Sequence, residues 1–293
     1  MLQRTLGHVD VSAIGLGAMP MSVAGRPDEA RSISTIHAAL DAGVTLIDTA
    51  DAYHLGSDEV GHDERGHNET LITGALTSWG GDTDRVLVAT KGGHTRTADG
   101  TWLRNGRPEH LKRAARESAA RLGVEAIGLY QHHRPDPDVP YADTIGALAE
   151  LLDEGVIRAA GISNADPAQI REANAVLGGR LASVQNQFSP AFRSSRPELE
   201  LCAELGIAFL PWSPLGGIGK AAGLGEQHEA FSRIADARGA SPQQICLAWE
   251  LAQSPTVIPI PGASRPASIE SSVAALDITL TADELAALDE VSS

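Results

Sequence analysis

Short apolar runs alternate with segments of helical periodicity along nearly the whole chain, which is the pattern of strands followed by helices. Eight runs are strand candidates: 13–17, 44–48, 86–90, 127–131, 157–163, 182–186, 207–212 and 256–260. The helical pattern is clearest in EARSISTIHAALDAG, PEHLKRAARESAARLG, YADTIGALAELLDEG and SPQQICLAWELAQ. These alternations predict an α/β protein, a (β/α)8 or TIM barrel that spans residues 1–293 as a single domain.

A doubly wound sheet is the competing fold for this alternation. Such sheets usually carry a glycine-rich turn after an early strand. Here GLG at 15–17 is followed by AMP and lacks the third glycine, so the barrel is favoured. The opening segment QRTLGHVDVS predicts a short hairpin that turns at Gly7 and caps the bottom of the barrel.

The barrel prediction makes the C-terminal ends of the strands important, because those ends converge on one face, where barrel enzymes place their sites. Polar or ionisable residues follow one apolar run after another. In chain order they are Asp48, Thr90-Lys91, His132-His133, Ser163-Asn164, Gln185-Asn186, Trp212-Ser213 and the segment 259–262. A packed core requires none of them, so we expect a functional site at this face.

Composition and charge narrow the function. The net charge of −15 argues against nucleic acid and anionic membranes as partners. No apolar stretch is long enough to span a membrane, and the N-terminus lacks the apolar segment of a signal peptide. Cys202 and Cys246 show neither a disulfide framework nor metal-ligand spacing, which indicates two buried thiols in the cytoplasm.

Asp48, Tyr53, Lys91 and His133 form a candidate proton-delivery site for a carbonyl oxygen. A free tyrosine has a pKa of about 10, and a nearby lysine is expected to lower it. Aspartate keeps that lysine charged, and histidine can orient the substrate oxygen by a hydrogen bond. Hydride for the carbonyl carbon must come from a cofactor, because side chains cannot supply it.

Seven motifs in chain order resemble those of the aldo-keto reductases, from near Leu6 to about Leu288. They are DTADAY, ATKGG, LYQHHRPDP, GISN, SVQNQFS, PWSPLGG and IPIPGASRPASIESS. The order of motifs is most similar to that of the pyridoxal-reductase-like bacterial members. The resemblance implies an NADPH-dependent oxidoreductase that reduces small-molecule aldehydes or ketones, with Tyr53 as the proton donor. Because the family's histidine directly precedes the arginine, the resemblance selects His133 over His132.

The same resemblance implies which residues hold the cofactor. Trp212 stands where the family has the aromatic ring that stacks on nicotinamide. The implied contacts are Met19, Ser163, Asn164, Gln185, Trp212, Ser213, Pro214, Leu215, Gly216, Gly262, Ser264, Arg265, Ser268 and Ser272. Gly262 and Ser268 replace basic residues of several members, so Arg265 is the remaining clamp for the 2′-phosphate. We therefore expect NADPH rather than NADH.

Alternatives remain at this point. A redox-sensing subunit that binds NADPH without turnover is one, and a metal-dependent barrel hydrolase that uses the histidines and acids is another. We expect the segment 54–65 to be a mobile lid and Asp51 to be a helix cap or solvated loop acid. Trp102 is either a wall of the substrate pocket or a ring packed on the surface.

Overall fold

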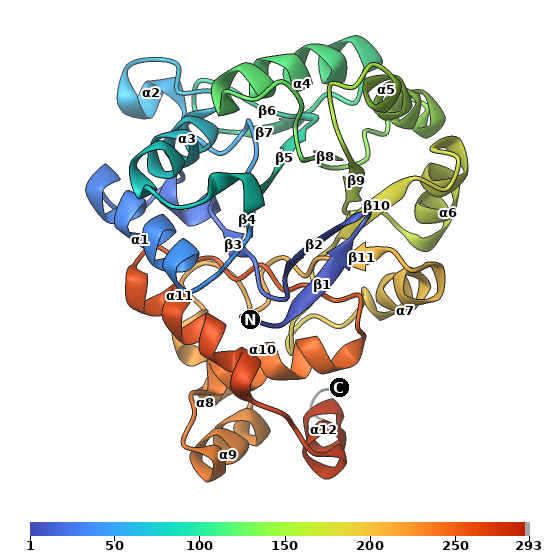
Figure 1. Cartoon of the computed structure of the whole chain (residues 1–293). Helices are drawn as coiled ribbons and strands as arrows, with labels where there is room; N and C mark the ends of the chain where they lie inside the picture. Colours follow the sequence, from blue (N-terminus) through green and yellow to red (C-terminus); the bar gives the residue numbers. More distant parts are fainter. Residues whose placement is uncertain (291–293) are drawn as a thin grey trace.

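Seven parallel strands form a curled sheet in the order β11-β10-β9-β8-β5-β4-β3. The computed structural model describes residues 1–290, and Figure 1 shows helices surrounding this sheet. The strands are β3 (Leu16–Gly17), β4 (Leu46–Asp48), β5 (Leu87–Gly92), β8 (Leu129–His132), β9 (Ala160–Ser163), β10 (Leu181–Gln185) and β11 (Ala208–Phe209). They read as nearly continuous apolar runs because parallel strands are covered on both faces. Each falls within or overlaps a predicted run.

The eighth predicted strand is present as an irregular segment. Its residues 256–262 lie between the two edge strands: Ile258 N donates to Phe209 O on β11 at 2.8 Å, and Gly17 N of β3 donates to Pro261 O at 3.0 Å. Pro259 and Pro261 have no N–H groups, so the segment cannot form a regular ladder. The predicted (β/α)8 architecture is confirmed, with seven regular barrel strands and one irregular strand.

Helices surround the barrel strands, and most of them connect one strand to the next. The larger ones are α1 (Glu29–Asp41), α3 (His67–Trp79), α4 (Pro108–Leu122), α5 (Tyr141–Asp153), α6 (Pro167–Val176), α7 (Arg196–Leu205), α9 (Glu229–Arg238), α10 (Pro242–Gln253), α11 (Pro266–Val273) and α12 (Ala282–Asp289). Two single-turn helices, α2 (Ser57–Val60) and α8 (Leu224–Gln227), lie in connections. Local sequence sets the helix starts: α6 and α10 each begin with a capping box and a proline in the first turn.

An N-terminal hairpin closes one end of the barrel, as predicted. It consists of β1 (Gln3–Leu6) and β2 (Val9–Ser12), and Figure 1 shows it crossing the barrel opening. Leu6 and Val11 are buried in one cluster with Leu46, Ala182 and other residues of the barrel interior. Because the hairpin plugs the N-terminal end, the opposite end is left for the site.

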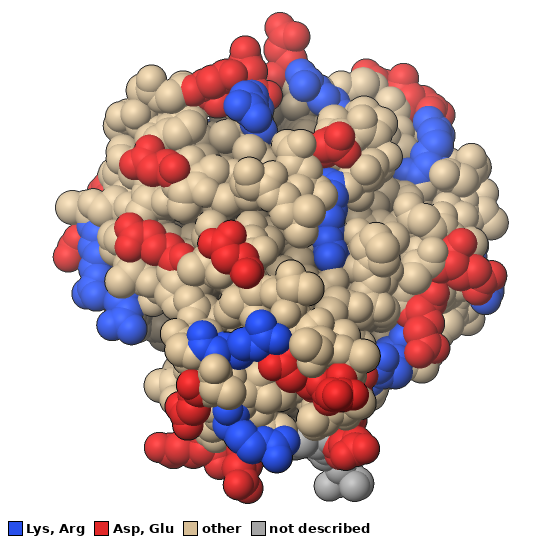
Figure 2. Space-filling view, turned by 60° about the horizontal axis from the view of Figure 1, so that its bottom comes forward, with Lys and Arg blue, Asp and Glu red and all other residues tan. Residues whose placement is uncertain are grey.

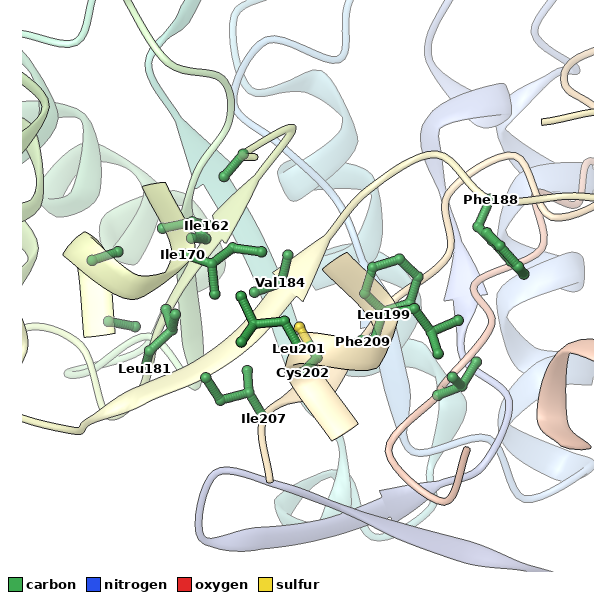
Figure 3. Packing of buried hydrophobic residues seen from close by; sticks show 14 of the residues in the cluster. Ile162, Ile170, Leu181, Val184, Phe188, Leu199, Leu201, Cys202, Ile207 and Phe209 are labelled. Atoms are coloured by element: carbon green, nitrogen blue, oxygen red, sulfur yellow. The ribbon is translucent and has the colours of Figure 1, made fainter. Parts of the chain in front are cut away.

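The main apolar core lies between the sheet and the outer helices. Figure 3 shows Ile170 of α6 and Leu199 of α7 packed with Ile162, Val184 and Phe209 of the strands. The close packing of β-branched and aromatic side chains fixes the barrel strands, and thereby the positions of the residues at their ends.

Strands β6 (His94–Arg96) and β7 (Trp102–Arg104) form a separate antiparallel hairpin after β5.

The surface carries both signs of charge. On the face shown in Figure 2, acidic and basic side chains are interspersed, although the chain as a whole has a net charge of −15. Within residues 1–290, no helix is both long enough and apolar enough to cross a membrane.

Candidate active site

A cavity of about 570 Å³ opens at the C-terminal ends of the strands. Its walls come from β3, β4, β9 and β10, from the segments after β8, after β11 and after residue 260, and from the β6–β7 hairpin. The predicted convergence of strand ends therefore occurs. Asp48, Tyr53 and His133 line the cavity, and Lys91 lies directly behind them.

Lys91 is the centre of the predicted catalytic group. Its ammonium is fully buried and donates to Asp48 Oδ1 at 2.5 Å, to the backbone oxygen of Thr49 at 2.8 Å and to the Tyr53 hydroxyl at 3.2 Å. Three acceptors satisfy all three N–H groups of the ammonium. A buried charge is tolerated only when it is paired and hydrogen-bonded in this way.

Asp48 is held from two further strands. Gln185 Nε2 on β10 donates to Asp48 Oδ2 at 2.7 Å, and Gln131 Nε2 on β8 approaches the same oxygen at 3.3 Å. Gln131 in turn accepts from Ser183 Oγ at 3.2 Å. These contacts fix both carboxylate oxygens and so fix the position of Lys91.

The Tyr53 phenol keeps its proton at neutral pH. Burial raises its pKa, and the Lys91 ammonium opposes that rise without cancelling it. Lys91 does lower this pKa, as expected, but desolvation outweighs the ion, so the pKa lies above its ordinary value. Burial also lowers the pKa of Lys91, but Asp48 and Tyr53 outweigh this, so the ammonium stays charged.

His133 presents a neutral imidazole to the cavity. Burial first, and the Lys91 charge second, hold the pKa of His133 well below its ordinary value. Its ring centroid lies 5.6 Å from that of Tyr53, in an edge-on arrangement. A neutral ring beside a phenol can donate a hydrogen bond to a substrate oxygen that accepts a proton from Tyr53. His132 is buried behind it, with its ring centroid 6.1 Å from that of Tyr141.

Backbone strain marks two further residues of the cavity wall. Within residues 1–290, Asn164 (φ 58°) and Ser213 (φ 52°) are the non-glycine residues with positive φ, and both line the cavity. Asn164 Nδ2 donates to His133 O at 3.0 Å and to Ser163 Oγ at 2.9 Å. Ser163 Oγ donates to Gln185 O at 2.7 Å. Such strain persists where surrounding contacts over-determine the conformation, and it clusters at ligand sites.

The family model for the aldo/keto reductase family matches residues 13–293. The chain belongs to the aldo/keto reductase family. This membership makes it an oxidoreductase that reduces carbonyl groups, as the motifs implied.

Relatives and solved structures agree with this assignment. The reductase is 36% identical over 289 residues to an uncharacterized oxidoreductase of Schizosaccharomyces pombe, covering 97% of this chain and 88% of the relative. It is 30% identical over 302 residues to pyridoxine 4-dehydrogenase of Escherichia coli, covering 98% and 97%. The glycerol dehydrogenase of Gluconobacter oxydans superposes with a TM-score of 0.84 at 26% identity, covering 98% of this chain and 94% of that one. An aldo/keto reductase from Klebsiella pneumoniae, solved with NADP and acetate, has a TM-score of 0.80 at 27% identity, covering 99% and 95%.

Most of the predicted cofactor contacts line the same cavity of the reductase. They are Met19, Ser163, Asn164, Gln185, Trp212, Ser213, Pro214, Leu215, Gly262, Ser264 and Ser268. Gly216, Arg265 and Ser272 are not among its lining residues. Arg265 nevertheless donates from Nε to Ser268 Oγ at 2.9 Å, whereas the Ser272 hydroxyl donates to the backbone of Ser268 at 3.0 Å.

The residues present fit a dinucleotide. Trp212 offers a ring, and its Nε1 is buried without a partner. Gly217 and Gly219 lie on the wall in conformations with positive φ, so backbone there can approach a pyrophosphate closely. Ser264 and Ser268 supply hydroxyls, and Arg265 supplies positive charge beside Ser268. These groups suit the amide, ring and phosphates of NADPH.

Trp102 lies in the wall of the cavity. Its ring centroid is 6.4 Å from those of Tyr53 and His133 and 5.3 Å from that of His94. The Arg96 guanidinium lies over the Trp102 ring, 4.5 Å from its centroid. Trp102 is 37% exposed and lines the cavity, so it is available to contact a substrate.

Two loop predictions fare differently. Asp51 is 4% exposed, and the prediction of a solvated or capping acid is wrong. Its Oδ1 has no hydrogen-bond partner, and burial, followed by the charge of Glu69, raises its pKa to about 8.

The segment 54–65 contains α2. It is held by a bidentate Arg26–Glu64 ion pair and by Asp58 N, which donates to Ala98 O at 2.9 Å. Its role as a lid stays a prediction.

Sequence reasoning missed several residues of the cavity wall, among them His94, Arg104, Arg134 and Ile218. It also missed Gln131, which supports Asp48 from behind. A polar residue in the otherwise apolar run IGLYQ was a signal for Gln131. Arg134 was visible next to His133, whereas the β6–β7 hairpin that carries His94 and Arg104 was not predicted.

Proposed function

We propose that Tyr53 is the proton donor of this reductase, that Lys91 stabilises the phenolate that forms, and that Asp48 keeps Lys91 charged and in place. The observation that carries the proposal is the contact between the buried Lys91 ammonium and the Tyr53 hydroxyl at 3.2 Å. The ammonium would favour the phenolate more than the phenol, so its effect would grow as the proton leaves.

His133 orients the carbonyl oxygen in this proposal. Its neutral imidazole would donate a hydrogen bond to that oxygen, and Tyr53 approaches the same region edge-on at 5.6 Å between ring centroids. NADPH, when bound, supplies the hydride for the carbonyl carbon. Ser163, Asn164 and Trp212 would position the nicotinamide, and Trp102 would cover the substrate.

The complete set of proton-delivery groups supports catalysis over a regulatory role without turnover. A panel of small aldehydes and ketones with NADPH tests the proposal, with loss of NADPH absorbance as the readout. Turnover of several compounds is expected. Tight NADPH binding without turnover of any compound would contradict the proposal and support the regulatory alternative.

The substrate is a small molecule in this proposal, because the cavity of about 570 Å³ also has to hold part of the cofactor. Cys202 and Cys246 are both buried and unpaired, which supports action in a reducing compartment such as the cytoplasm.

A further inference from the structure

Two guanidinium groups line the cavity on the side of His133. Arg134 follows His133 directly, and Arg104 is the last residue of β7. The register of the hairpin places Arg104 opposite His94, whose ring centroid lies 4.4 Å from that of His133. The hairpin therefore fixes Arg104 on the same side of the cavity as the proton-delivery groups.

Neither arginine has a carboxylate partner. The ion pairs formed within residues 1–290 involve other arginines, lysines and histidines. Arg134 Nη2 donates to the amide oxygen of Asn164 at 3.0 Å, which is a neutral acceptor. Asp48 is the carboxylate among the residues that line the cavity, and Lys91 already neutralises it. This side of the cavity thus carries unbalanced positive charge in a chain whose net charge is −15.

The arrangement would attract an anion. Burial lowers the pKa of Arg134, and the positive charge of Arg104 lowers it further. Arg104 and Arg134 repel each other, so binding of an anionic ligand that is attracted to both would be favourable. Arginine is also the residue best suited to carboxylate or phosphate recognition.

The phosphates of the cofactor are expected elsewhere. Gly217 and Gly219 follow β11, and Ser264 and Ser268 follow the irregular eighth strand at residues 256–262. Arg134 follows β8, and the hairpin with Arg104 follows β5. Counted around the barrel from β3, β5 and β8 are the third and fourth strands. They lie opposite the seventh strand, β11, and the irregular eighth strand. The arginines therefore face the phosphate-binding segments across the barrel mouth, and their charge is available to the substrate.

We propose that the substrate carries an anionic group, a carboxylate or a phosphate, in addition to its carbonyl, and that Arg104 and Arg134 bind this anion. The proposal rests on the proposed carbonyl reduction and names its substrate class. Arg134 also contacts Asn164, so Arg104 is the residue that tests the idea without disturbing the nicotinamide side.

The test compares charged aldehydes with neutral counterparts of similar shape. One pair is 4-carboxybenzaldehyde and methyl 4-formylbenzoate, and a second is glyceraldehyde 3-phosphate and glyceraldehyde. For the wild type we expect a higher kcat/KM for the charged member of at least one pair, and the pair that shows it identifies carboxylate or phosphate. This preference should shrink as salt concentration rises. Equal or better use of both neutral members would overturn the proposal.

The variants assign the preference to Arg104. Arg104→Gln is expected to reduce the charged-to-neutral ratio of kcat/KM by about 5- to 10-fold, a modest factor because the side chain is exposed. Arg104→Lys should restore part of it. Arg107→Gln is the matched control, because Arg107 is exposed three residues later and does not line the cavity. Unchanged ratios in Arg104→Gln, or the same loss in Arg107→Gln, would overturn the proposal.

Two further measurements separate the possible failures. The Kd for NADPH is expected to be the same in Arg104→Gln and wild type, and a matching loss of NADPH affinity would assign Arg104 to the cofactor instead. If no aldehyde is reduced, the proposed function fails. In that case, calorimetry with 4-(hydroxymethyl)benzoate on the NADP-loaded protein still tests the anion-binding role of Arg104. Weaker binding in Arg104→Gln than in the wild type would support that role. Equal binding in the two proteins would overturn it.

Discussion

Gln185 donates a hydrogen bond from Nε2 to Asp48 Oδ2 at 2.7 Å, although the two residues are 137 positions apart in the sequence. The bond joins β10 to β4 across the barrel interior. Asp48 shares its other oxygen with Lys91 at 2.5 Å. Gln185 thus has a structural task, the orientation of Asp48, besides the nicotinamide contact that the motif implied.

Substitution of Gln185 should reveal this task. Gln185→Leu leaves a buried carboxylate oxygen without its nearer donor, which costs about 1–3 kcal/mol. We expect a lower thermal midpoint. We also expect a lower kcat, because Asp48 would hold Lys91 beside Tyr53 less firmly, and a loss of about 1.4 kcal/mol in transition-state stabilisation would reduce kcat tenfold. Gln185→Glu, which is isosteric, should be worse, since two carboxylates would repel each other. Wild-type kcat and stability in Gln185→Glu would show that the bond to Asp48 is unimportant.

Tyr53→Phe tests the proton donor. The variant removes the hydroxyl next to Lys91 and leaves the ring packed against Trp102 and His133. We expect kcat to fall by about 10²- to 10⁴-fold, the usual contribution of a positioned acid. The Kd for NADPH, measured by fluorescence quenching, should change little. A variant that keeps near-wild-type turnover would remove Tyr53 from its assigned role.

Lys91 and Asp48 should be strongly coupled in stability. Lys91→Met leaves Asp48 as an unpaired buried carboxylate, and removal of one member of such a pair typically costs about 3–5 kcal/mol. The double variant Asp48→Asn with Lys91→Met removes both charges and should be less destabilised than Lys91→Met alone. Denaturant unfolding of the wild type, the two single variants and the double variant measures this coupling. Additive losses would contradict the predicted dependence of one charge on the other.

The sequence predicted this group well because its logic is topological. Asp48, Lys91 and His133 each follow an apolar run, and strand ends of a barrel meet at one face. No residue-level detail was needed to bring them together. Their partners Gln131 and Ser183 are harder to recognise, because polar residues inside a buried strand have the same spacing as core residues.

Features that depend on loop packing could not be predicted. The sequence around Asp51 is typical of a turn, yet Asp51 is 4% exposed and interacts electrostatically with Glu69 of α3 and Arg121 of α4. The balance of burial against charge at Tyr53 also depends on how completely the site is enclosed. Likewise, the hairpin that carries Trp102 and Arg104 has a pairing of only three residues on each strand, too short for a clear periodic signal.

Asp51 should make stability depend on pH. Its folded-state pKa of about 8 lies above its unfolded value of about 3.9. Between these values the folded state holds a proton that the unfolded state has released, so this group makes stability fall as pH rises from about 4 to 8. Asp51→Asn removes that dependence, and its thermal midpoint relative to wild type should be higher at pH 8 than at pH 5. Asp84→Asn, at an exposed acid, is the control and should show no such change. An Asp51→Asn difference that is the same at both pH values would show that Asp51 is ionised in the folded protein throughout this range.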